Sequence, residues 1–334
     1  MSHHNFTTRR TRMPGIYVAA LTAVVSGVSV FVNSYGVRRV SSPLLYTTSK
    51  NIVAAVILVA AWGWGARAIG RRTPSLSPEG AHAHATSGRR GPRATRLHRT
   101  LGLGYVGVVG GGLAFVLFFN GLARSQPASA AFWRDTLVPE VALLAVFFLK
   151  ERLTWWNLVA LALLVAGEIL ATGGVGHLGA RPGEIEIVAS SGLWAFEVII
   201  AKALLRDTAP AAVAAVRMSV GAAALMAYLA TSGRIGALFT LTAHQLWWIA
   251  ATGVLLALYV ATWMIALSRA RALDVTSILV GAAVVTWALQ EIAGGASNAP
   301  AVLGLALIGT GTLLTLVAAA TRRPGYRWAL GPRS

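Results

Sequence analysis

Apolar residues fall in long runs along this chain, and polar residues gather between the runs. Each run is roughly 20 residues long, the length that an α-helix needs to cross a hydrocarbon core about 30 Å thick. The runs lack the period-two alternation of a transmembrane barrel, and backbone amides in a bilayer must bond within their own segment, so we expect an all-α integral membrane protein. The ten predicted transmembrane helices are Pro14 to Gly36, Pro43 to Gly65, Leu101 to Leu122, Gln126 to Leu149, Thr154 to Thr172, Glu184 to Leu205, Thr208 to Thr231, His244 to Leu267, Leu273 to Gly294 and Ala299 to Ala320.

Basic residues are unevenly shared among the segments between the predicted spans. Of the 29 Lys and Arg, 21 fall in segments on one side of the membrane, five in loops on the other side and three inside spans. In a soluble protein such an excess over 11 acidic residues would suggest nucleic acid, but basic loops between spans mark the cytoplasmic face. We therefore expect a multi-pass inner-membrane protein with both termini cytoplasmic, in contact with the lipid bilayer and with no nucleic-acid partner.

The segment from residue 66 to residue 100 interrupts the apolar pattern. It is rich in Pro, Gly, Ser, His and Arg, and it cannot bury enough apolar area to offset its ordering entropy. We predict a mobile cytoplasmic loop here, in which His82 and His84 are solvated and bind no metal. Residues 1–13 and 322–334 are predicted to be cytoplasmic tails.

Polar residues inside the spans indicate an internal repeat. Three pairs of positions correspond: Pro43 with Pro210, Lys50 with Arg217, and Arg124 with Arg269. They predict two five-helix units, residues 14–173 and residues 184–321, that face opposite ways because five is odd. Such inverted halves can expose a shared site to each side of the membrane in turn. Chance alignment of apolar helices of similar composition is the alternative explanation.

Charged residues inside the spans are the candidates for chemistry, because one charge at the bilayer centre costs about 2.5 to 3.5 kcal/mol on insertion scales. Five acids and three bases lie in or close to the spans: Asp135, Glu140, Glu168, Glu197, Glu291, Lys50, Arg134 and Arg217. At least two carboxylates therefore lack a basic partner within the membrane. Such acids must face water, bind a cation or stay protonated.

Aromatic residues share helix faces with several of these acids, at spacings of four or seven residues. This arrangement suits a substrate with an apolar body and an amine or hydroxyl group. The substrate-cavity candidates are Asn120, Trp133, Asp135, Glu140, Trp194, Glu197, Tyr259 and Trp263. The candidate structural or gating charges are Lys50, Arg134, Glu168, Arg217 and Glu291. Pro139 is predicted to kink the fourth span.

Sequence motifs of enzymes are absent from the chain. It contains no HExxH, no GxSxG, no GxxxxGK and no acidic cluster with the spacing of metal ligands. The lack of cysteine excludes disulfides, iron–sulfur clusters and thiolate metal sites. We therefore expect no catalytic residues, no metal and no cofactor.

The order of these features resembles the drug/metabolite transporter superfamily, specifically members with two EamA-type domains. Besides the paired positions above, the resemblance is carried by Gly121 to Ala130, Val138 to Ala145, Leu149 to Thr154 and Gly192 to Ala195, and it extends from Pro14 to Thr321 outside the 66–100 loop. It implies a ten-helix bundle around a central cavity that exports or exchanges amino acids or drug-like amines by alternating access. Ser26-Gly27 stands where the family usually has Trp-Gly, and Arg134-Asp135 is atypical of the family. The substrate is therefore the property that the resemblance predicts least well.

The sequence thus favours a secondary transporter of small organic metabolites, with proton coupling assigned first to Glu197. The alternative is a non-transporting membrane sensor or assembly protein whose buried charges are structural. A channel is a third hypothesis, but no filter loop or ring of like charges supports it.

Overall fold

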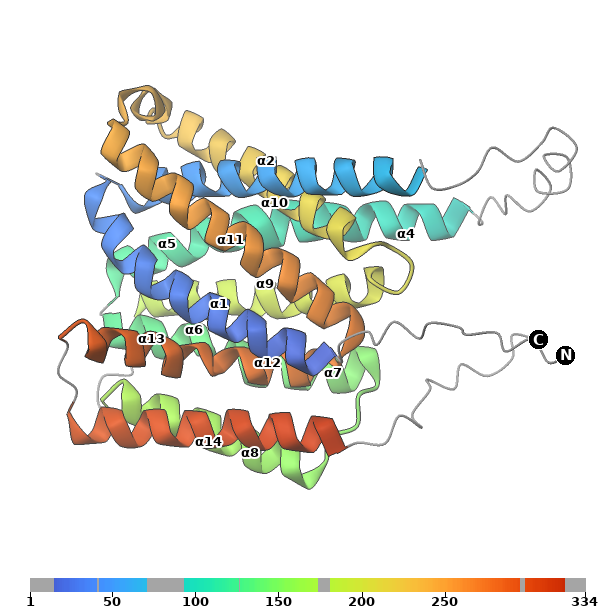
Figure 1. The fold of residues 1–334 in the computed structure, drawn as a ribbon, viewed down its shortest axis with the longest axis vertical. Coiled ribbons are helices and arrows are strands. Elements are labelled where there is room, and N and C mark those ends of the chain that lie inside the picture. The colour runs from blue at the N-terminus through green and yellow to red at the C-terminus, as the bar shows by residue number, and fades with distance from the viewer. Residues whose placement is uncertain are drawn as a thin grey trace, which may run out of the picture.

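The computed structural model describes residues 15–40, 42–70, 93–125, 127–173, 181–294 and 298–321, and within these ranges it is helical and contains no strand. Its long helices run side by side, with the start of the first helix and the end of the last helix at the same end of the bundle (Figure 1). The elements are α1 (Gly15–Gly36), η1 (Val37–Arg39), α2 (Pro43–Gly70), α4 (Arg93–Gly104), the π-helical η3 (Tyr105–Leu113), α5 (Ala114–Arg124), α6 (Pro127–Asp135), α7 (Leu137–Leu149), α8 (Trp155–Ala171), α9 (Pro182–Leu204), α10 (Pro210–Thr231), η5 (Ile235–Thr240), α11 (Ala243–Arg269), α12 (Ala272–Val280), α13 (Ala282–Ile292) and α14 (Ala299–Thr321). We call the end of the bundle that holds Gly15 and Thr321 the terminal end, and the opposite end the distal end.

Eight helices of the described residues are long and apolar enough to cross a membrane. The other two predicted spans take a different form. The predicted span from Gln126 to Leu149 is divided into α6 and α7, and α8 has only 17 residues. The chain is therefore an all-helical, multi-pass membrane protein, and ten crossings remain a prediction.

Two of the passes are broken near their middle. The break between α6 and α7 falls at Thr136, three residues before Pro139. Proline has no amide hydrogen and its ring collides with the carbonyl four residues earlier, here that of Asp135, so a regular helix cannot continue. The break between α12 and α13 falls at Gly281, 145 residues after Thr136, which is also the interval between Arg124 and Arg269.

Helix extends into both margins of the predicted 66–100 loop. α2 continues to Gly70 and α4 begins at Arg93. Long arginine side chains allow a helix to continue past the apolar core, because their charged groups reach the headgroups or water. Residues 71–92, which include His82 and His84, lie outside the described residues.

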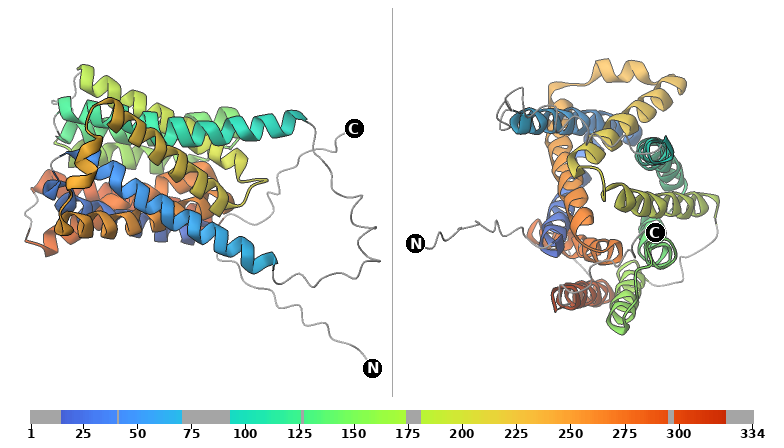
Figure 2. Two further views of the ribbon diagram at one scale, coloured as in Figure 1. Left: turned by 90° about the horizontal axis from the view of Figure 1, so that it is seen from above. Right: turned by 90° about the vertical axis from the view of Figure 1, so that its right-hand side faces the viewer.

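Glycine pairs allow several helices to approach closely, as is common in membrane proteins. α8 lies along α14 at one edge of the bundle, as the end-on view in Figure 2 shows, and Gly167 meets Gly304 at this contact. Likewise, Gly111 of η3 lies against the backbone of Gly221 in α10. A side chain at any of these four positions would separate the two backbones.

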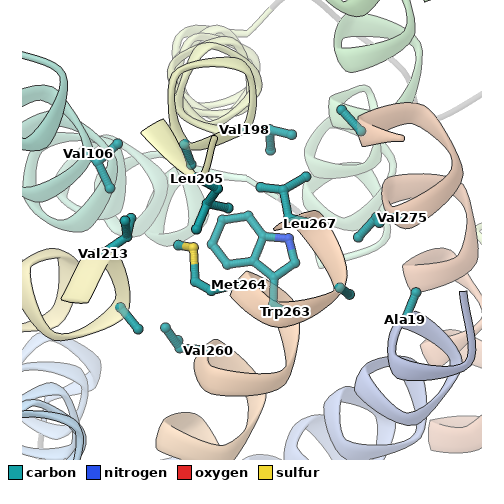
Figure 3. Packing of buried hydrophobic residues seen from close by; sticks show 14 of the residues in the cluster. Ala19, Val106, Val198, Leu205, Val213, Val260, Trp263, Met264, Leu267 and Val275 are labelled. Carbon is teal, nitrogen blue, oxygen red and sulfur yellow. The ribbon is translucent and has the colours of Figure 1, made fainter. Parts of the chain in front are cut away.

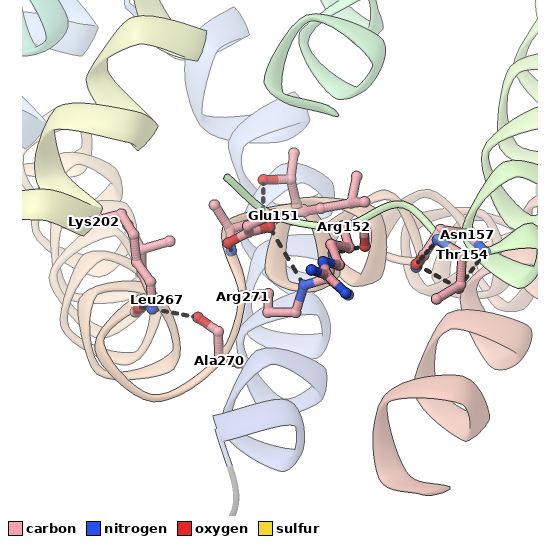
Figure 4. A network of polar contacts seen from close by, with 11 residues as sticks. Glu151, Arg152, Thr154, Asn157, Lys202, Leu267, Ala270 and Arg271 are labelled. Carbon is pink, nitrogen blue, oxygen red and sulfur yellow. Dashed lines mark hydrogen bonds and ion pairs between the residues drawn. The ribbon is translucent and has the colours of Figure 1, made fainter. Parts of the chain in front are cut away.

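Polar contacts fasten the terminal end of the bundle (Figure 4). Lys202, in the last turn of α9, donates hydrogen bonds of 2.6 Å to the carbonyls of Leu267 and Ala270 and so caps the end of α11. The carboxylate of Glu151, which follows α7, accepts from the backbone amides of Ala272 at 2.8 Å and Leu273 at 3.3 Å. These contacts place a cation at a helix C-terminus and an anion at a helix N-terminus, as the helix dipole favours.

We predict that Gly304→Ala destabilises the protein, because the new Cβ would lie 2.5 Å from the carbonyl oxygen of Gly167. Overpacking of this kind costs about 1 to 3 kcal/mol. Thermal unfolding in detergent should show a lower Tm for this variant. Gly63→Ala is the matched control, since nothing lies within 4 Å of its added Cβ, and its Tm should not fall. Equal Tm values for the two variants would contradict the close packing of α8 on α14.

Candidate functional site

A buried ion pair joins α9 to α10. Arg217 donates from Nε to Oε1 of Glu197 and from Nη2 to Oε2 at 3.1 Å, and the two side chains are 8% and 1% exposed. Two parallel hydrogen bonds match the planar guanidinium to the carboxylate. In an apolar interior each charge requires the other, because an unpaired one would bear a large desolvation penalty.

Aromatic side chains surround this ion pair. The guanidinium of Arg217 lies 5.4 Å from the centre of the Trp263 ring, and Trp263 stacks nearly parallel on Tyr259, with ring centres 6.3 Å apart. A cation over the face of a tryptophan is attracted by the ring quadrupole. The structure thus brings together three of the predicted cavity residues, Glu197, Tyr259 and Trp263, through Arg217.

Gly110 of η3 completes this cluster from the first half of the chain. A Cβ added at Gly110 would overlap the carboxylate of Glu197, so the position must remain bare. The indole of Trp194 donates to the Gly110 carbonyl at 3.0 Å. π-Helical segments frequently occur at functional sites. Nothing in the sequence indicated that this glycine-rich stretch would border Glu197.

Toward the terminal end, the cluster is closed by apolar packing. Figure 3 shows Trp263 among side chains from six elements, including Val106 of η3, Leu205 at the end of α9 and Val275 of α12. Every residue from Ala272 to Ile278 in α12 is buried. This side of the ion pair is therefore dry in the present structure.

On the distal side, Trp194 packs into a cluster of phenylalanines. Its ring centre lies 5.2 Å from that of Phe115 and 5.6 Å from that of Phe118. Asn120 follows on the same helix, half-buried, one turn before Arg124. These three rings form an apolar cluster between α5 and α9.

A small pocket of about 50 Å³ lies where the two broken passes meet α8. Asp135, Thr136 and Pro139 line it from the first break, Val280 from the second, and Glu168 from α8. Glu168 and Asp135 interact electrostatically in this pocket, and one oxygen of Glu168 is buried without a partner in the described parts of the chain. Two ionised carboxylates in such proximity repel each other.

Arg134 stands beside this pocket and forms an ion pair of 3.1 Å with Asp135. Its side chain is 51% exposed although it lies near the middle of a pass, and it interacts electrostatically with Tyr259 of α11. Arginine at membrane depth faces a wet cavity or a partner more often than lipid. The contact with Asp135 and the proximity of Tyr259 place Arg134 toward the interior of the bundle.

Glu140 and Trp133 lie on either side of the first break. Glu140 accepts a hydrogen bond of 3.1 Å from Thr136, while its second oxygen, like the indole nitrogen of Trp133, is buried without a partner among the described residues. The hydroxyl of Ser191 donates to the carbonyls of Trp133 and Arg134 and so holds α6 against α9. Glu140 and Glu168 thus form no ion pair in the described structure, in line with the count of unpaired acids from the sequence.

Lys50 lies away from the Glu197 cluster, in the distal half of α2. Its ammonium donates to Oδ1 of Asn33 at 3.0 Å and lies 5.3 Å from the ring centre of Tyr46. The Tyr46 hydroxyl lies 2.9 Å from both Asn33 and Thr252 and bonds to each. The sequence identified Lys50 but not these partners, which come from two other helices. Glu291 lies in the last turn of α13.

Comparison with known proteins gives one family and one fold. Residues 13–173 match the model of the EamA-like transporter family. No curated protein matches the chain. Among the solved structures that match, one titled "Crystal structure of protein" is 18% identical, with a TM-score of 0.67, and the match covers 91% of this chain and 99% of that one. At this identity the match shows a shared fold.

We predict that Glu197→Gln lowers stability sharply, because it leaves the buried Arg217 without a counter-ion, at a cost of about 3 to 5 kcal/mol. The double variant Glu197→Leu/Arg217→Met should recover most of the loss, since it removes both charges. Tm in detergent measures both effects. Glu186→Gln is the control, because the Arg124–Glu186 pair is exposed and its loss costs about 1 kcal/mol or less. A double variant no more stable than the single one would show that the pair is not what holds this region.

Proposed function

Because the chain belongs to the EamA-like transporter family of the drug/metabolite transporter superfamily, we propose that it is a secondary transporter that exports or exchanges small organic metabolites such as amino acids or drug-like amines. Proteins of this family are membrane transporters and not enzymes, so the chain acts on a small-molecule substrate within a lipid bilayer. We further propose that it resides in the inner membrane with its terminal end in the cytoplasm, where basic segments concentrate.

The paired helix breaks are the observation that carries this proposal. In secondary transporters, interrupted helices at corresponding positions of two inverted halves mark the binding site. Thr136 and Gly281 are separated by the same 145 residues as Arg124 and Arg269 of the predicted repeat, and residues beside both breaks line one pocket. Lys50 and Arg217 support the same symmetry, since each lies two turns from the start of its helix, one at the distal end and one at the terminal end.

Alternating access follows from the contacts that close one end. The Glu151 and Lys202 caps and the apolar packing around Trp263 seal the terminal end. Glu151 belongs to the predicted first unit, and its partners Ala272 and Leu273 to the second. We propose that these contacts separate when the two units rock apart, which opens the site to the cytoplasm, and that the distal end then closes.

The carboxyl pair in the pocket is the best place for proton coupling. Glu197, the first candidate from the sequence, has both oxygens engaged by Arg217. Asp135 and Glu168 interact electrostatically instead, and one Glu168 oxygen remains without a partner in the described chain. A proton held between two acids can be released when the pocket opens to water, which links its movement to that of the solute.

Counterflow in proteoliposomes tests the proposal. Liposomes loaded with unlabelled amino acids and aromatic amines should accumulate the labelled form of at least one of them, whereas liposomes without protein should not. Glu168→Gln should retain this exchange but lose accumulation driven by a pH gradient, because it removes one of the two acids that share the proton. Glu186→Gln, in the exposed pair with Arg124, should retain both.

Two outcomes would contradict these proposals separately. Absence of exchange for every solute in the panel would favour the alternative of a non-transporting sensor or assembly protein. Proton-driven accumulation by Glu168→Gln equal to that of the wild type would retain the transporter and exclude the carboxyl pair as its coupling site.

A further inference from the structure

We propose that Lys50 binds an anionic oxygen group of the transported solute, so that the substrates include small organic acids or zwitterions with an apolar body. This inference rests on the proposed transport function and names the chemical class that the carrier accepts. It concerns a different part of the molecule from the carboxyl pair.

All the contacts of Lys50 in the described structure are with neutral groups. Its ammonium has three donors, and one of them is used, in the bond to Asn33. Tyr46 contributes only its ring face and a bond to the same Asn33 oxygen. No carboxylate in the described chain forms an ion pair with Lys50. The ammonium therefore has no ionic partner and two donors without a partner in the described structure.

The corresponding cation in the second half is neutralised. Arg217 takes its partner Glu197 from the preceding helix, 20 residues upstream. Lys50 also takes its partner from the preceding helix, 17 residues upstream, but there the residue is the amide Asn33. In both places a cation contacts a residue of the preceding helix, but Arg217 has the carboxylate of Glu197 as its partner whereas Lys50 has only the amide of Asn33. A ligand can supply the missing charge.

The position of Lys50 favours a solute over a lipid headgroup. Lysines near helix ends normally extend toward the membrane surface. Lys50 lies two turns inside α2, and Asn33 of α1 holds its ammonium against the neighbouring helix. Its partner Tyr46 is 1% exposed, so the ammonium is held beside a buried side chain.

Aromatic side chains pack around the buried cluster that includes Tyr46, whose ring lies beside the ammonium of Lys50. Phe115 packs against the cluster of buried residues that contains Tyr46, and its ring meets that of Trp194 edge to face. In the proposed site, the Phe115 and Trp194 rings receive the apolar body of a solute whose carboxylate binds Lys50. This combination of one polar anchor and an apolar wall is typical of small-molecule sites.

Thermal shift of the purified protein in neutral detergent tests the inference with pairs that differ in the acid group. The probes are N-acetylphenylalanine and its amide, N-acetylleucine and its amide, and 3-phenylpropionate and 3-phenyl-1-propanol. We expect at least one acid to raise the Tm of the wild type with an affinity about tenfold or more above that of its neutral partner, the size of a charge-assisted contact. Lys50→Gln should lose that difference, and Lys50→Arg should keep it.

Arg234→Gln is the control, because Arg234 is an exposed cation at the same end of the bundle and its loss should leave the difference unchanged. The inference is overturned if no acid stabilises the wild type, if the neutral partners stabilise it equally, or if Lys50→Gln still prefers acids. It is also overturned if phosphatidylglycerol, added to the detergent, gives the only stabilisation that depends on Lys50, since the anion is then a lipid.

Counterflow with the same variants separates this inference from the transport proposal. Exchange of amines that is equal in wild type and Lys50→Gln, with no binding of acids, would retain the carrier and refute the anion site. Binding of acids that depends on Lys50, without any exchange, would retain the site and refute the carrier.

Discussion

The ion pair between Glu197 and Arg217 determines how the centre of this protein is built. A charge in an apolar interior needs a partner, and this pair forms only if α9 and α10 place two side chains 20 residues apart against each other. The carboxylate also requires that Gly110 of η3 remain without a side chain, and the guanidinium requires the face of Trp263. One electrostatic constraint thus fixes the relative positions of four elements from both parts of the chain.

Glu168 and Lys50 differ from this pair, because neither forms an ion pair in the described structure. Asp135 and Glu168 meet in a pocket between two helix breaks, and Lys50 has only neutral partners. Both sites keep an ionisable group that is unfavourable in hydrocarbon. A proton can neutralise the carboxyl pair, and an anionic solute can neutralise Lys50. The contrast between the neutralised centre and these incomplete sites is the physical basis of the carrier proposal.

Much of the fold could be predicted from the sequence, because the length and apolarity of a span are properties of the segment itself. The family was identified correctly, and eight of the helices are long enough to cross. The break near Pro139 was also predictable from the chemistry of proline. Gly281 gave no comparable signal, since glycine is common in membrane helices for packing alone.

The candidate site was harder to predict, because the pairing of side chains on different helices depends on how each helix is rotated and packed in the bundle. The sequence identified Glu197, Arg217 and Lys50 as important, but not which of them pair. The role of Glu151 as a cap on α12 was also missed, since it joins residues more than 100 positions apart. A carboxylate directly after an apolar helix is the signal that could have indicated it.

The central claim is that the pocket between the two breaks opens to water on either side of the membrane. The chain has no cysteine, so single cysteines at Thr136 and Val280 can be labelled in liposomes with a membrane-impermeant maleimide, added outside or trapped inside. The account predicts labelling of both positions from both sides. It also predicts none at a cysteine in place of Leu143, an exposed side chain of α7 that lipid would cover. Labelling of the pocket from one side alone, or from neither, would contradict it.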